Sequence, residues 1–153
     1  MKFDGAKAEL YKAHQTGLEK YTYFLLAAAG AAIGFAVQKT EGLRLTWWLL
    51  PVALATLTWA LSFVCGCKNI SYTNVTLNSN MELIDLQNGH HPVPGIPHDV
   101  LVQLTREKTH KHADRAHSYG VWQFRFLILG AAFFIAWRVV EMARLTLCVQ
   151  PGN

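Results

Sequence analysis

Charged side chains are scarce in this sequence: Asp, Glu, Lys and Arg make up 16% of the 153 residues, against 52% hydrophobic residues. A typical globular domain carries about 25% charged residues. Disordered tails need more charge than this and collagen needs far more glycine, so both classes are excluded. With three cysteines, the chain is no disulfide-stapled secreted scaffold either. Its length suits one compact unit and is too short for two ordinary domains.

The sequence also lacks the common motifs of nucleotide and hydrolase chemistry. No G-x-x-x-x-G-K, G-x-S-x-G or G-x-G-x-x-G occurs, which removes the usual arguments for NTPase, hydrolase or dinucleotide-binding activity. No internal repeat and no low-complexity tract is visible. We therefore expect no cofactor, and an enzyme is the less favoured class of function.

The sequence is rich instead in long uncharged runs. Residues 21–38 and 45–67 contain no charged side chain. As helices they would be about 27 and 35 Å long, which matches a hydrocarbon core of about 30 Å. A third run, 126–137, is shorter, but the arginines at its ends can snorkel and apolar neighbours extend it to 119–141. Since aromatic residues stand at the ends of all three runs, we predict an all-α integral membrane protein with three transmembrane helices.

Basic residues favour one orientation of these spans. Segments 1–20 and 68–118 carry nine Lys and Arg residues, whereas the link 39–44 and the C-terminal end from Arg138 carry four. Because Lys and Arg are enriched in cytoplasmic segments, we expect a cytoplasmic N-terminus, a cytoplasmic middle segment and an external tail over 142–153. The expected location is a bacterial inner membrane.

The segments outside the spans are expected to continue the helices into a cytoplasmic helical bundle. The N-terminal segment contains no proline before the first span, and its apolar residues recur at helical spacing, so one helix over 3–38 is predicted. Asp99 is a good N-cap for a helix that leads into the third span. The second span either projects inward too or gives way to a short helix that starts at Ser79 and Glu82, which have capping-box spacing. The Pro-rich run 90–99 is predicted to reverse the chain.

Small residues indicate where the spans pack. Gly30 and Gly34 form a GxxxG motif in the first span, and Gly130 lies in a small-residue patch of the third. In lipid, such residues let helices approach closely. The motif serves packing either between the spans of one chain or between copies. We treat residues 1–153 as a single membrane domain whose partners are the lipid bilayer and either further copies or another membrane protein, with no nucleic-acid binding.

The densest group of reactive side chains lies between Arg106 and His117. On a helix, Glu107, His110, Asp114 and His117 share one face, and Glu-x-x-His is a spacing used in di-iron carboxylate bundles. Those bundles need two such motifs and further glutamates, whereas this sequence has one. A solvated helix face beneath the membrane is the favoured interpretation, and no metal ligand or catalytic residue is assigned.

Five residues separate Arg106 from His112, which is similar to the R-x4-6-H signature of HEPN ribonucleases and of some membrane proteins that accompany CRISPR effectors. The resemblance implies cleavage of RNA. Around a helix axis the two side chains are about 120° apart, so they can meet only across chains or at a distorted turn. RNA cleavage is therefore not the favoured function.

Charged residues also bracket the third span. Arg125 and Arg138 stand at its ends, and Glu141 follows Arg138 by one turn. These membrane-edge charges either line an aqueous path or contact a partner subunit. In the favoured interpretation the arginines snorkel, and Arg138 pairs with Glu141 along the helix.

In layout, the chain looks like the small multi-span membrane effectors of bacterial anti-phage modules, CRISPR-associated or similar. This likeness covers the whole chain and is one of architecture, without a shared motif. It implies a non-enzymatic, oligomeric membrane protein with a role in antiviral defense, whose cytoplasmic helices control a channel or a perturbation of the bilayer. One alternative is an accessory subunit that stabilises a larger membrane complex. Another is a membrane-tethered metal- or RNA-processing enzyme that uses the helix over 106–117.

Overall fold

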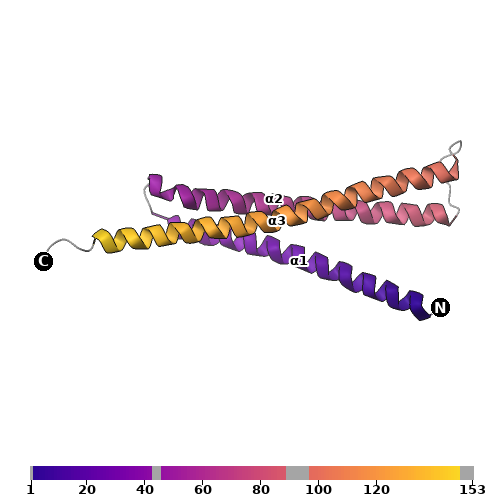
Figure 1. Cartoon of the computed structure of the whole chain (residues 1–153), viewed down its shortest axis with the longest axis horizontal. Coiled ribbons are helices and arrows are strands. Elements are labelled where there is room, and N and C mark those ends of the chain that lie inside the picture. The colour runs from indigo at the N-terminus through magenta and orange to yellow at the C-terminus, as the bar shows by residue number, and fades with distance from the viewer. Residues whose placement is uncertain (1, 43–45, 89–96, 149–153) are drawn as a thin grey trace.

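The computed structural model describes residues 2–42, 46–88 and 97–148. Helix accounts for 96% of them, and no strand occurs among them. Three long helices, α1 (Lys2–Thr40), α2 (Leu50–Gln87) and α3 (His98–Cys148), follow one another, with the 3-10 turn η1 (Trp47–Leu49) before α2 (Figure 1). The all-α prediction is confirmed. Most of the Pro-rich run over 90–99, part of the link 39–44 and the last five residues of the tail lie outside the described residues.

Each helix continues well beyond its predicted span. α1, α2 and α3 have 39, 38 and 51 residues, so they are about 58, 57 and 76 Å long, roughly twice the thickness of a hydrocarbon core or more. The prediction of one helix over 3–38 is confirmed. α2 runs without a break through Ser79 and Glu82, and Ser79 is buried within it. The alternative of a separate short helix is therefore wrong.

Local rules explain two of the helix ends. Gly42 has a φ of +78° and stands just after α1, where a left-handed conformation that favours glycine reverses the chain. α3 begins at His98, because the Pro97 carbonyl accepts hydrogen bonds from two backbone N–H groups of the first turn at 3.1 and 3.2 Å. The predicted N-cap at Asp99 is wrong by this geometry. Asp99 lies inside the first turn, where its negative charge suits the helix dipole.

α2 and α3 form a long antiparallel pair, which α1 joins over only part of its length. In Figure 1, α3 follows α2 from one end of the molecule to the other, whereas the N-terminal half of α1 diverges from both. We call residues 68–87 and 98–118 the hairpin arm. The apolar end comprises residues 21–40, 47–67 and 119–141. The parts outside the apolar end are thus a two-helix arm and a separate helix, and the predicted cytoplasmic helical bundle stays a prediction.

α2 and α3 pack on each other through positions that recur with a seven-residue period. On each helix, positions that advance alternately by three and four residues are buried or half-buried. On α3 these positions are Thr105, Thr109, His112, Ala116, Tyr119, Gln123, Phe126, Gly130, Phe133 and Trp137, and on α2 they are Val52, Ala55, Trp59, Ser62, Gly66, Asn69, Thr73 and Thr76. This is the period of a left-handed coiled coil. We call this interface the α2–α3 seam; it runs without interruption from the apolar end into the hairpin arm.

In the apolar end, large apolar side chains face outward while several polar side chains are buried. Leu57, Leu61 and Val64 of α2 are 61%, 50% and 54% exposed, while Ser62 and Gln123 are fully buried. A water-soluble bundle shows the reverse distribution, and helices that pack in lipid show this one. All three helices are long and apolar enough to cross a membrane.

The apolar core sits where all three helices meet. Its buried members come from every helix: Ala36, Val52, Ala55, Trp59 and Trp137. Phe134 packs between the two indoles, with ring centroids 5.7 Å from Trp59 and 5.5 Å from Trp137. This core fixes the three helices together at one end of the molecule, whereas in the described part of the hairpin arm α2 and α3 pack on each other.

Candidate functional site

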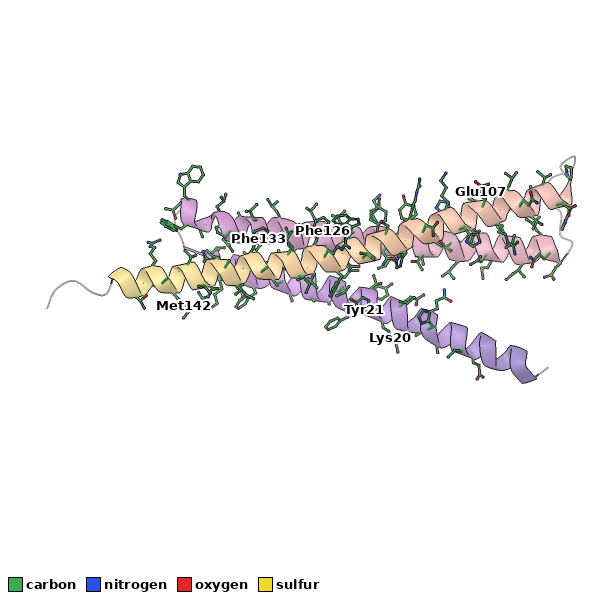
Figure 2. The ribbon with its side chains drawn as sticks, in the orientation of Figure 1. Lys20, Tyr21, Glu107, Phe126, Phe133 and Met142 are labelled. Atoms are coloured by element: carbon green, nitrogen blue, oxygen red, sulfur yellow. The ribbon has the colours of Figure 1, made fainter. Side chains whose placement is uncertain are left out.

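The predicted polar cluster is an open helix face. Arg106, Glu107, His110, Asp114 and His117 are all exposed on the part of α3 that belongs to the hairpin arm, where Figure 2 labels Glu107. Within the described part of the chain, no three His, Cys, Asp or Glu side chains come close enough together to hold a metal ion. This exposure agrees with the interpretation of the cluster as a solvated face.

His112 differs from its neighbours because it lies in the α2–α3 seam. Its ring stacks on Tyr72, with centroids 5.9 Å apart, and Tyr72 stacks in turn on Tyr119 at 5.5 Å. The Arg115 guanidinium lies 6.0 Å from the Tyr72 centroid. Nδ1 of His112 is buried and has no hydrogen-bond partner among the described residues.

The seam does not bring His112 to Arg106. α3 is continuous through both residues, so they stay on different faces of the helix, with Arg106 exposed and His112 half-buried. Within one chain, the R-x4-6-H spacing therefore forms no joint site.

A buried side-chain amide, that of Gln123, lies about three turns beyond His112 along α3. The Gln123 side chain is 0% exposed, and neither Nε2 nor Oε1 has a hydrogen-bond partner in the described ranges. The Ser62 hydroxyl donates to the main-chain carbonyl of Gln123 at 2.7 Å and not to its side-chain amide. Because an unpaired buried polar group costs about 1–3 kcal/mol, Gln123 lowers the stability of the closed seam. Any movement that lets the amide reach a partner recovers that cost.

Glycines on both helices allow this close approach. A Cβ at Gly66 would lie 2.6 Å from Nε2 of Gln123 and 2.7 Å from Cδ2 of Leu26 on α1. A Cβ at Gly130 would lie 2.5 Å from Nε1 of Trp59, which donates to a main-chain carbonyl of α3 at 3.2 Å. A Cβ at either site would force its neighbours to shift. At Gly66 these neighbours are the ends of flexible side chains, whereas at Gly130 they include the rigid Trp59 indole, so Gly130 has the stricter need for glycine. Gly130 thus packs against its own chain.

Gly30 and Gly34 are used differently. Both are exposed, and a Cβ at either position would meet no atom within 4 Å. α1 packs on the other helices through a separate face that includes Thr22, Leu25 and Ala29, all buried. Of the two uses predicted for the GxxxG motif, packing between the spans of one chain is not what the described residues show. Contact between copies stays a prediction.

Arginines at both edges of the third span lie over tryptophan rings. Cζ of Arg125 is 5.4 Å from the Trp122 ring centroid, and Cζ of Arg138 is 5.7 Å from that of Trp137. Each guanidinium thus makes a cation–π contact with a tryptophan of its own helix, and snorkelling of the arginines stays a prediction. No ion pair joins Arg138 to the half-buried Glu141 in the described structure, so that predicted pair does not form.

Tyr72 was missed by the sequence-based prediction, which rested on clustered charge, and so were the seam residues Ser62, Gly66 and Gln123. Their signal is the seven-residue spacing of small and polar residues, which continues through the predicted spans. The sequence matches no known family model, and no curated protein or solved structure shows significant similarity to it.

Proposed function

We propose that this chain is a non-enzymatic integral membrane protein that self-associates, and that its hairpin arm controls the packing of its spans. The oligomer opens a pore or perturbs the bilayer when the arm receives a signal. A single observation carries this proposal: an unpaired, fully buried Gln123 side chain lies in the seam that joins the arm to the apolar end.

The outward surface supports the membrane location. Large apolar side chains are exposed around the apolar end, among them Phe24 at 68%, Ile135 at 62% and Val139 at 60%. Lipid covers such a surface, whereas in water it would be an aggregation hazard. The excess of basic residues in segments 1–20 and 68–118 favours a cytoplasmic N-terminus and a cytoplasmic arm in a bacterial inner membrane.

The continuous α2–α3 seam supports the proposal that the hairpin arm controls the packing of the spans. Because packed interfaces switch between discrete arrangements instead of deforming smoothly, a shift of α3 against α2 in the arm is transmitted to the spans. Gln123 makes the closed arrangement less stable, which keeps an alternative arrangement within reach of a binding event. Tyr72, stacked on Tyr119 and His112, gives the arm a structured contact that a partner can alter.

The outward glycines support self-association. Gly30 and Gly34 leave a shallow face on α1 that no other helix of the chain covers in the described structure. A second copy of α1 can approach that face closely, since small residues favour helix–helix contact in lipid. Assembly through this face would bring together the larger number of spans that a pore needs.

The test combines oligomer size with membrane leakage. The full chain is reconstituted into liposomes, where cross-linking reports association and release of a trapped dye reports perturbation. Gly30→Ile with Gly34→Ile should reduce cross-linked oligomer by about tenfold and abolish leakage, because bulky side chains fill the shallow face. Ala60→Ile, at an exposed position of α2, is the matched control and should behave as wild type. A wild-type chain that is monomeric in liposomes contradicts the proposal.

A specific observation favours an accessory subunit as the second candidate. Leu10 and Leu18 in the diverging half of α1 are 73% and 55% exposed, on a helix that lies apart from the arm (Figure 1). A partner protein that covers this half would stabilise the chain. In that case, the chain expressed alone should be degraded rapidly or aggregate, and dye release should be absent even when oligomers form.

A further inference from the structure

A groove lined by both charged and apolar side chains lies at the end of the molecule opposite the hairpin arm. It has a volume of about 230 Å³ and lies between the start of α2 and the last turns of α3. Trp48 and Leu49 line it from the η1 side, and Trp137, Glu141 and Arg144 line it from α3. Met142, on the same stretch of α3, is labelled in Figure 2.

The groove presents a negative and a positive group that do not neutralise each other. Glu141 is half-buried and forms no ion pair within the described structure. The guanidinium of Arg144 lies over the Trp48 ring, 5.8 Å from its centroid, and that of Arg138 lies over Trp137. Since Glu141 and Arg144 are three residues apart, they face the same side of α3. A ligand with one cationic and one anionic group would match both.

The surroundings of the groove are those of a membrane interface. Trp47 and Trp48 are 86% and 56% exposed, as aromatic side chains at the headgroup level are. Val140, which lines the groove, and its chain neighbour Val139 are 42% and 60% exposed, and Leu50 at the start of α2 is 52% exposed. A ligand with hydrocarbon chains could lay them along this surface while its headgroup enters the groove.

We propose that the groove binds a phospholipid with an ethanolamine headgroup. Its ammonium donates to the Glu141 carboxylate, and its phosphate accepts from the Arg144 guanidinium, which suits phosphate geometry. A choline headgroup has no N–H to donate to Glu141. A glycerol headgroup carries no cation, so the carboxylate repels its lipid. This inference depends on the membrane location that is part of the proposed function.

The test measures which lipid the protein retains. The full chain in detergent is mixed with equal amounts of phosphatidylethanolamine, phosphatidylcholine and phosphatidylglycerol with identical acyl chains, and native mass spectrometry counts the bound lipids. Wild type should retain the ethanolamine lipid about fivefold over the other two, because charge-assisted hydrogen bonds distinguish them. Glu141→Gln should remove this preference, and Arg144→Gln should lower retention of all three lipids.

Two matched controls isolate the groove. Arg125→Gln removes an arginine that also lies over a tryptophan, and Glu107→Gln removes an exposed carboxylate of the arm; both variants should keep the wild-type preference. Equal retention of the three lipids by wild type overturns the inference, and so does an unchanged preference in Glu141→Gln. Glycerophosphoethanolamine, which has no acyl chains, should bind far more weakly than the lipid, and equal binding would also overturn a lipid site.

The same spectra separate this inference from the proposed function. Oligomers of wild type without a lipid preference contradict the inference alone. A chain that stays soluble without detergent and carries no lipid contradicts both the inference and the membrane location.

Discussion

α2 has two neighbours in this molecule, and it packs on them in different ways. Its contact with α3 extends from the apolar end to the tip of the arm, through glycine, serine and a buried glutamine. α1 contacts the pair only within the apolar end and then diverges (Figure 1). The glycines illustrate the difference. Side chains of neighbouring helices occupy the space where a Cβ of Gly66 or Gly130 would lie, whereas a Cβ at Gly30 or Gly34 would meet no atom within 4 Å.

This difference teaches that small residues in apolar helices do not all serve one purpose. In the α2–α3 seam they fix the internal register, because each glycine has a specific large side chain opposite it. On α1 they leave a surface that only another molecule can cover. Substitutions at the two kinds of glycine should therefore have different effects. In the seam they should lower the stability of the chain, and on α1 they should weaken association between copies.

The largest effect is expected for Gly130→Leu. The new side chain would collide with the Trp59 indole and displace its hydrogen bond to α3, so overpacking should destabilise the protein by about 3 kcal/mol. Thermal unfolding in detergent, followed by circular dichroism, measures this loss. Gly34→Leu is the matched control, because its side chain enters open space and should leave the unfolding temperature nearly unchanged. Equal loss in both variants would refute the distinction.

A smaller effect, of opposite sign, is expected for Gln123→Met. Methionine has a similar shape and no amide, so it removes the cost of the unpaired buried group and should stabilise the protein by about 1–2 kcal/mol. Gln103→Met, at an exposed position of α3, should change the unfolding free energy little. If the seam switches as proposed, the more stable Gln123→Met variant should also release less dye from liposomes. Destabilisation by this substitution would show that the amide has a partner in the membrane.

Much of the fold could be predicted from the sequence, because uncharged runs such as 21–38 and 45–67 are typical of helices that are long and apolar enough to cross a membrane. The divergence of α1 from the other two helices could not be predicted, because its N-terminal apolar residues have helical spacing whether or not another helix covers them. The candidate site was harder still. Reactive side chains cluster at 106–117 in the sequence, yet most of them are exposed. The buried amide of Gln123 has no signal in the sequence apart from its seven-residue spacing.

The smallest effect is expected for Ser62→Ala. Ser62 is buried and donates to the Gln123 carbonyl at 2.7 Å, but that carbonyl lies inside α3 and keeps its helical hydrogen bond when the hydroxyl is lost. Interhelical hydrogen bonds of this kind contribute about 0.6 kcal/mol in membrane proteins, so the unfolding temperature should fall slightly. Ser71→Ala, at an exposed position of α2, should have no effect. A loss comparable to that of Gly130→Leu would mean that hydrogen bonding, and not close packing, holds α2 against α3.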